Sequence, residues 1–419
     1  MCCNYKVNEC YSICVFRYLD AIKMIFQNRE GIKMKKNPLI AVNELGQSIW
    51  MDFISRRMIF SGQLKELIET DGITGITSNP SIFEKAIAEG HDYDAAIMDL
   101  VHAGKSADEI YQTLTVTDIQ SAADLLRPVY LKTLGADGYV SLEVSPRLAY
   151  DTAGTIEEAR RLWRLVDRPN VMIKVPGTKE GIPAIKQLIA EGININVTLL
   201  FGLPRYQEVA EAFVAGLEDR LSKGRPIGDI FSVASFFLSR IDVLLDPMLD
   251  QIGRKDRITG ETAKRLKGQT ALSSAKIAYQ VYKNIFIGDR FNKLARIGGR
   301  PQRLLWASTS TKNPEYPDTK YVEPLIGPET INTLPIETID AYRDHGEPHT
   351  TLSNDVHESR TRLELLKEVG IDLDKITQQL ENEGVEKFTK AFDQLMNALK
   401  QKQEDLRSHT VRRQVHAAN

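Results

Sequence analysis

Short apolar runs alternate with longer amphipathic stretches from about residue 45 to about residue 350. The apolar runs are nearly continuous, which is typical of strands covered on both faces. They predict strands at residues 48–54, 73–78, 139–144, 170–175, 193–200, 229–237, 302–308 and 330–334. The stretches between and after them predict helices at residues 62–70, 81–88, 107–126, 156–167, 180–190, 204–223, 239–252, 260–284, 288–297 and 357–403.

The alternation of eight strands with helices predicts an α/β fold, a single-domain (β/α)8 TIM barrel with a C-terminal helical extension. An open doubly wound sheet is less favoured. No GxGxxG motif follows the first strand, so a dinucleotide site is not indicated. The segment 312–328 is rich in Pro, Lys, Asp and Tyr and predicts a long surface loop at the functional end of the barrel.

The barrel and its C-terminal helices are expected to occupy residues 37–403. Met34, followed by two lysines, resembles a natural start just ahead of the first strand. Residues 1–36 are therefore interpreted as an N-terminal extension, either disordered or produced by a non-native start. A targeting peptide is less favoured because the segment carries acidic residues. Residues 404–419 predict a polar, frayed tail.

Composition narrows the class of protein. The 419 residues are 42% hydrophobic and 26% charged, as in a globular protein with a sizeable core. The formal net charge of −2 favours neither nucleic acid nor a membrane surface as a partner. No apolar stretch approaches the about 20 residues of a membrane span. All four cysteines fall in the first fourteen residues, so the rest of the chain forms no disulfides, which fits a reducing, cytoplasmic setting. The spacing of these cysteines matches no common zinc pattern, so a zinc site is not favoured.

Single polar residues interrupt several of the predicted strands. The lysine within residues 171–175 is the most unusual, because a buried ammonium group is unfavourable unless it is paired or used in chemistry. The other interrupting residues are Asp52, Asn79, Glu143, Asn196 and Thr198. One polar group per apolar strand is expected if the strands direct these groups into one shared pocket, as a parallel barrel can.

This lysine, Lys174, has two interpretations. A single lysine in a strand more often reaches solvent from the strand end or pairs with a buried carboxylate. Here it lies on the face opposite Val171, Ile173 and Val175, and a Pro-Gly-Thr loop follows the strand. Inside a barrel, loss of hydration favours a neutral amine, which can attack a carbonyl and form a Schiff base. The iminium would then accept electrons as an adjacent carbon–carbon bond breaks.

The other interrupting residues fit this chemistry, although each also has a structural explanation. Asp52 and Glu143 could bind backbone amides or neighbouring cations, but Schiff-base chemistry needs proton shuttles, and two carboxylates near one lysine supply them. Thr198 could fill space, or it could hold a water against Glu143. Asn79 and Asn196 could orient substrate hydroxyls or satisfy backbone groups at strand ends.

Candidates for a phosphate site follow the sixth and seventh strands. They are Ser235 with Arg240, and Ser308 with Lys312, which offer hydroxyls and cations. Barrel phosphate sites often form near the last strands. A loop rich in Ser and Thr with a solvated lysine is the simpler interpretation of residues 308–312 taken alone.

Taken in order, these residues resemble the transaldolase family. The matching segments are Trp50–Asp52, Thr77–Ser81, Leu142–Ser145, Ile173–Thr178, Asn194–Phe201 and Ser308. The matches span residues 45–400, and the lysine and Asn-x-Thr-Leu motifs on consecutive strands are the most specific of them. Residues 306–312 are similar to those of the longer bacterial and plant-type members.

The resemblance implies a (β/α)8 barrel that transfers a dihydroxyacetone unit from sedoheptulose 7-phosphate or fructose 6-phosphate to an aldose phosphate. This reaction belongs to the non-oxidative pentose phosphate pathway. Lys174 would be the Schiff-base lysine, and Asp52 would exchange a proton with the C4 hydroxyl of the donor. Glu143, through a water held by Thr198, would move protons as the carbinolamine forms and breaks down.

The residues that the resemblance implies for substrate binding are Asn79, Asn196, Ser235, Phe237, Arg240, Ser308 and Lys312. The asparagines would bind dihydroxyacetone hydroxyls, the phenylalanine would line the pocket, and the remaining side chains would hold phosphate. One position departs from the family pattern. Shorter members carry an arginine where this chain has Ser310, and Lys312 is expected to supply the missing charge.

The resemblance implies no metal and no cofactor, and it makes sugar phosphates the expected partners, while homo-oligomerisation stays open. Two other functions are retained as hypotheses. A fructose 6-phosphate aldolase-like enzyme would release free dihydroxyacetone, although such relatives are shorter. The second is a non-catalytic barrel that binds sugar phosphates. It is little favoured because each position that the reaction requires carries a suitable residue.

Overall fold

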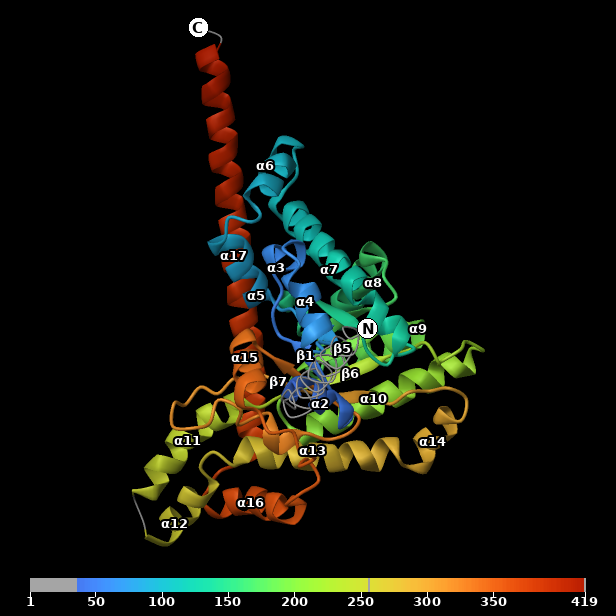
Figure 1. The fold of residues 1–419 in the computed structure, drawn as a ribbon, viewed down its shortest axis with the longest axis vertical. Coiled ribbons are helices and arrows are strands. Elements are labelled where there is room, and N and C mark those ends of the chain that lie inside the picture. Colours follow the sequence, from blue (N-terminus) through green and yellow to red (C-terminus); the bar gives the residue numbers. More distant parts are fainter. Residues whose placement is uncertain (1–35, 255–256, 418–419) are drawn as a thin grey trace, which may run out of the picture. The chain divides into compact units, whose positions relative to one another are not determined.

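The apolar runs form eight parallel strands, each paired with the next, and β8 pairs with β1 to close a barrel (Figure 1). The computed structural model describes residues 36–254 and 257–417. The strands are β1 (Gln47–Met51), β2 (Gly75–Ile76), β3 (Tyr139–Glu143), β4 (Val171–Pro176), β5 (Ile195–Leu200), β6 (Ser232–Phe237), β7 (Arg303–Ala307) and β8 (Thr330–Leu334). The predicted (β/α)8 barrel and its eight strands are confirmed.

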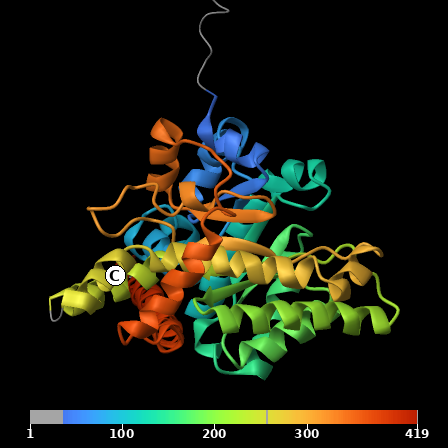
Figure 2. The same ribbon diagram turned by 90° about the horizontal axis from the view of Figure 1, so that it is seen from below.

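Helices connect successive strands and cover the outside of the barrel, and α10 and α13 lie side by side there (Figure 2, green and yellow-orange). They are α2 (Pro38–Glu44), α3 (Arg56–Phe60), α4 (Gln63–Thr70), α5 (Pro80–Glu84), α6 (Asp94–His102), α7 (Ala107–Lys132), α8 (Thr152–Val166), α9 (Gly181–Glu191), α10 (Leu203–Ser222), α11 (Ser239–Gly253), α12 (Arg257–Leu266), α13 (Thr270–Phe286), α14 (Asp289–Ala295), α15 (Ile336–His345), α16 (Val356–Glu368) and α17 (Leu373–Ala417). Three short elements complete the set, the π-helical turn η1 (Lys85–Glu89) and the 3-10 turns η2 (Pro146–Leu148) and η3 (Glu323–Leu325).

Four helices were not predicted: α2, α3, α6 and α15. Each is ten residues long or shorter, and isolated helices of that length are marginal without tertiary contacts. Such contacts are present, since α6 packs against α7 and α17, and α15 packs against α2. The sequence patterns of these short helices are too weak to predict them without the tertiary contacts.

Two predictions about chain segments are wrong in part. The segment 312–328 is not purely a surface loop, because Tyr321, Val322 and Leu325 are buried and the segment contains η3. A buried hydrogen bond from the Tyr321 hydroxyl to Asp242 Oδ2 at 2.9 Å ties it to α11. The predicted frayed tail continues as part of α17 to Ala417. Residues 1–35 of the predicted extension lie outside the described residues.

Close packing inside the barrel requires a glycine on β2. Gly75 is the register partner of Trp50 on β1. A Cβ atom at residue 75 would lie 2.4 Å from the Trp50 indole ring, so the large ring occupies space that only glycine leaves free. The bulky residue on one strand therefore requires the smallest residue on its neighbour.

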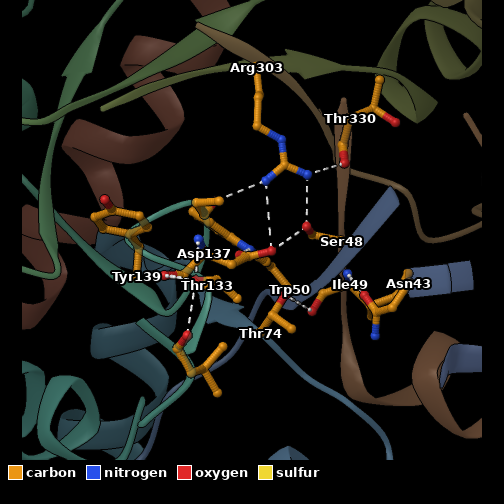
Figure 3. A network of polar contacts seen from close by, with 12 residues as sticks. Asn43, Ser48, Ile49, Trp50, Thr74, Thr133, Asp137, Tyr139, Arg303 and Thr330 are labelled. Carbon is orange, nitrogen blue, oxygen red and sulfur yellow. Dashed lines mark hydrogen bonds and ion pairs between the residues drawn. The ribbon is translucent and has the colours of Figure 1, made fainter. Parts of the chain in front are cut away.

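A polar network closes the N-terminal end of the barrel, opposite the carboxyl ends of the strands (Figure 3). Asp137, which is 6% exposed, accepts hydrogen bonds from Ser48 Oγ and from Trp50 Nε1. Arg303 Nη1 lies 3.7 Å from Asp137 Oδ2, and Arg303 Nη2 donates to Ser48 Oγ and to the Thr330 carbonyl at 2.7 Å. The network joins β1, β7 and β8 to the turn before β3.

No helix in the described part of the chain is both long enough and apolar enough to cross a membrane.

Replacing Asp137 with alanine should destabilise the barrel. The change leaves the Arg303 guanidinium and Trp50 Nε1 without their shared carboxylate, and breaking such a buried pair typically costs about 3–5 kcal/mol. We expect a clearly lower midpoint of thermal or guanidinium unfolding. Asp99→Ala, at an exposed position of α6, is the control and should change stability by less than about 0.5 kcal/mol. Equal midpoints for the two variants would contradict this account.

Candidate active site

A cavity of about 830 Å³ opens at the carboxyl ends of the strands. Its wall comes from the ends of β1, β2, β4, β6, β7 and β8 and from one side of α17. The residues predicted from sequence that line it are Asp52, Asn79, Lys174, Ser235, Phe237, Arg240, Ser308 and Lys312. Glu143, Asn196 and Thr198 lie behind this wall, within the barrel.

Lys174 extends from β4 into the base of the cavity. Its side chain is 4% exposed and is surrounded by the barrel interior. The ammonium nitrogen lies 3.2 Å from Glu143 Oε2 and donates a hydrogen bond to the Ser78 carbonyl at 2.9 Å. Glu143 faces it because the two residues are register partners on β3 and β4. Backbone pairing therefore fixes the amine beside a carboxylate.

Burial raises the pKa of Glu143 above its ordinary value, and the charge of Lys174 opposes this effect only in part. A carboxylate in this state is a stronger base than one in water, so it can accept a proton from the neighbouring ammonium. Glu143 Oε1 and Thr198 Oγ1 are both buried and have no hydrogen-bond partner among the described residues. Both atoms therefore keep unused hydrogen-bonding capacity.

Asp52 follows β1 and faces the same cavity. Burial of its carboxyl group raises its pKa, while Lys174, a hydrogen bond from Thr77 and the charge of Arg240 lower it. Thr77 Oγ1 donates to Asp52 Oδ1 at 2.7 Å. The Asp52 backbone N–H donates to the Leu334 carbonyl at 2.8 Å, which fixes the carboxyl group at the junction of β1 and β8.

The two predicted asparagines differ in position. Asn79 caps α5, where its Oδ1 accepts from the Ile82 backbone N–H at 3.0 Å, and its side chain lines the cavity. Asn196 is fully buried, with Nδ2 donating to Ser141 Oγ at 3.0 Å and Oδ1 accepting from Ser235 Oγ at 2.7 Å. Asn196 therefore reaches the cavity only through the Ser235 hydroxyl.

The outer part of the cavity carries the predicted cations. The Arg240 guanidinium lies 5.3 Å from the Phe237 ring centre, and burial lowers the pKa of this arginine. Lys312 is more exposed, and its amine donates to Ser310 Oγ at 2.5 Å. Ser308 has a φ of 53°, a strained conformation for a residue with a side chain, and such strain is often found at functional sites.

Several cavity residues were not found by sequence reasoning. Among them are Thr77, Ser81, Lys85, Thr333, Glu337, Glu383, Lys387 and Phe388. Thr77 and Ser81 flank the predicted Asn79, so their closeness to a predicted residue could have indicated them. Glu383, Lys387 and Phe388 lie on α17, whose amphipathic pattern predicts a helix but not which strand ends it covers.

No cluster of three or more His, Cys, Asp or Glu side chains with metal-binding geometry occurs among the described residues. The fold and the site together define a barrel enzyme with an enclosed lysine flanked by carboxylates. Such a site suits covalent chemistry on carbonyl compounds.

Comparison with known proteins specifies the family. Residues 49–399 match the model of the family described as transaldolase/fructose-6-phosphate aldolase. The chain is 49% identical over 375 residues to the transaldolase of Trichodesmium erythraeum, covering 88% of this chain and 98% of that protein. It is 50% identical over 374 residues to transaldolase 2 of Nostoc sp., with the same coverage. It is 47% identical to the transaldolase of Thermobifida fusca, covering 89% of this chain and all of that protein.

The chain therefore belongs to the transaldolase family. It is an enzyme of carbohydrate metabolism with transaldolase activity, and sugar phosphates are its substrates.

Replacing Thr77 with valine should move the acidic limb of the pH–activity profile to higher pH. The hydrogen bond from Thr77 lowers the pKa of Asp52, so its loss raises that pKa further. At a given acidic pH, less Asp52 is then ionised and able to accept a proton. The measurement is kcat/KM against pH for the wild type and the variant.

Thr333→Val serves as the comparison for this experiment. The Thr333 hydroxyl lies 2.9 Å from the Thr77 hydroxyl, but this substitution leaves the bond from Thr77 to Asp52 in place. Its acidic limb should stay near that of the wild type. An acidic limb that does not move in Thr77→Val would show that Asp52 does not set it.

Proposed function

We propose that the enzyme transfers dihydroxyacetone through a Schiff base on Lys174. The observation that carries this proposal is an enclosed amine 3.2 Å from the carboxylate of Glu143, at the base of a cavity large enough for a sugar phosphate. The amine attacks the C2 carbonyl of a ketose phosphate and forms a carbinolamine. Loss of water then gives the iminium.

Glu143 supports the first half of this chemistry. It takes a proton from the Lys174 ammonium, which frees the amine for attack, and it returns a proton to the leaving hydroxyl of the carbinolamine. The raised pKa of Glu143 favours acceptance of the ammonium proton, which the carboxyl group then holds until the hydroxyl leaves. A water bound between Glu143 Oε1 and Thr198 Oγ1 would carry these protons, and both atoms are free of other partners among the described residues.

Asp52 supports carbon–carbon cleavage. It accepts the proton of the C4 hydroxyl as the bond between C3 and C4 breaks, and the electron pair of that bond moves into the iminium to give an enamine. An aldose phosphate leaves. The reverse sequence with an acceptor aldehyde forms the new bond, and Asp52 then returns its proton. Asn79 and, through Ser235, Asn196 orient the hydroxyls of the three-carbon unit.

We assign sedoheptulose 7-phosphate and fructose 6-phosphate as donors, and glyceraldehyde 3-phosphate and erythrose 4-phosphate as acceptors, in the non-oxidative pentose phosphate pathway. The chemistry needs no metal and no cofactor, because the iminium is itself the electron acceptor. The cytoplasm is the proposed location, which the use of cysteine supports.

Fructose 6-phosphate aldolase activity is the alternative, since the matching family model covers both activities. An aldolase releases dihydroxyacetone by hydrolysing the adduct, whereas a transaldolase retains it until an acceptor arrives. Incubation with fructose 6-phosphate and no acceptor separates the two. We expect at most one equivalent of glyceraldehyde 3-phosphate per enzyme and no free dihydroxyacetone. Continuous release of dihydroxyacetone would establish the aldolase.

Reduction with borohydride in the presence of fructose 6-phosphate should attach a three-carbon adduct to Lys174. Peptide mass spectrometry would locate the modified residue and weigh the fragment. Lys174→Met should give no adduct and lower kcat by at least about 10⁴-fold, because without the amine no covalent path exists. An adduct on another lysine, or full activity of Lys174→Met, would reject the assignment.

The proposed domain limits give a further test. The family match begins at residue 49, and the described residues that line the cavity begin with Asp52, so we expect residues 1–33 to be dispensable for the reaction. Deleting them should leave kcat/KM within about twofold of the full chain, a difference of less than about 0.5 kcal/mol. A large fall in turnover would assign that segment a role in the reaction.

A further inference from the structure

Four basic side chains from different elements line the outer part of the cavity. Lys85 begins η1, Arg240 lies in the first turn of α11, Lys312 follows β7, and Lys387 lies on α17. Lys312 donates to Ser310. No described carboxylate forms an ion pair with Lys85, Arg240 or Lys387. Cations gathered in this way repel one another unless an anion binds between them.

Within this group, Arg240 has the strongest electrostatic effect on Lys387. The charge of Arg240 is the main cause of a lowered pKa of Lys387, ahead of burial and of the charges of Lys312 and Lys85. The Arg240 guanidinium is held between two aromatic rings, 5.3 Å from the centre of Phe237 and 5.8 Å from that of Phe388. Phe388 follows Lys387 directly on α17, so the residue next to Lys387 contacts the Arg240 guanidinium, and both cations line the same cavity.

Two ion pairs fix the part of α17 that carries Lys387. On one side, Arg205 Nε lies 3.1 Å from Glu381 Oε2, and the Glu381 side chain is only 6% exposed. On the other side, Arg147 Nη2 lies 2.5 Å from Asp393 Oδ1. Lys387 lies midway between these anchors in the sequence. The helix therefore holds its amine at the rim of the cavity.

The carboxylate of Glu383 also lines the cavity. Glu383 lies on α17, one helical turn before Lys387. Its Oε1 accepts a hydrogen bond from Gln379 Nε2 at 2.7 Å, and it forms no ion pair with Lys387. It therefore moderates the positive charge of the rim without neutralising it.

The structure assigns Lys387, together with Arg240, to binding the phosphate group of the sugar-phosphate substrate. Lys387 thereby becomes a determinant of the preference for phosphorylated over unphosphorylated sugars. Lys387 supplies from α17 a positive charge near the phosphate. The sequence had predicted that Lys312 alone replaces the arginine that is missing at residue 310. The assignment rests on the proposed function, because it takes the same cavity as the site of the sugar. A phosphate has the oxygens and the charge to bridge two cations held in this way.

Steady-state kinetics with fructose 6-phosphate as donor test the assignment. Lys387→Gln should raise the KM about tenfold with kcat within about twofold, a loss of about 1.4 kcal/mol of binding. Inhibition by inorganic phosphate should weaken to the same degree. Lys387→Arg should restore both values. Lys390→Gln, at an exposed position of the same helix outside the cavity wall, should match the wild type.

A binding measurement separates this inference from the proposed function. In a Lys174→Met background no Schiff base can form, so calorimetry reports only recognition of fructose 6-phosphate. There, Lys387→Gln should weaken binding about tenfold, and it should leave the weaker binding of fructose unchanged. Equal affinity with and without the Lys387 change would overturn the inference even if Lys174 proves to be the nucleophile. Equal weakening for fructose and its phosphate would also overturn it.

Discussion

The site depends on an ammonium and a carboxylate that are enclosed together. Lys174 and Glu143 are each less than 5% exposed at their side chains, and either charge alone would be strongly unfavourable there. Their contact is set by the pairing of β3 with β4, so a slip of one residue between these strands would place the two side chains on opposite faces of the barrel wall. The barrel thus holds a pair that exchanges a proton easily, because both members are already removed from water.

The remaining site is arranged in layers around this pair. Buried polar residues lie beneath it, among them Asn196, and connect to the cavity through hydrogen bonds rather than by direct exposure. Asp52 and its hydrogen-bond partner Thr77 form one wall of the cavity. Cations line the outer part of the cavity, where we propose that the phosphate group of the substrate binds. Helix α17 closes this outer layer, so the last helix of the chain is part of the active site.

Much of the barrel and its inner site could be predicted from the sequence, since polar residues inside continuous apolar strands stand out against their neighbours. Lys174 and Glu143 are examples. The rim was harder to predict. Lys387 lies on the polar side of an amphipathic helix, where lysines are common, and only the packing of α17 over the strand ends gives it a role. The segment 312–328 looked like a solvated loop because its polar composition concealed the buried Tyr321.

The central claim is that Glu143 exchanges protons with Lys174 during adduct formation, while Asp52 acts only at cleavage. Rapid mixing with fructose 6-phosphate, followed by a reductive quench, measures the rate of adduct formation directly. The account predicts that Glu143→Gln slows this rate at least about 100-fold, in line with the loss of a general acid–base group, while Asp52→Asn leaves it near the wild-type value and slows release of the aldose phosphate. Adduct formation at the wild-type rate in Glu143→Gln would contradict it.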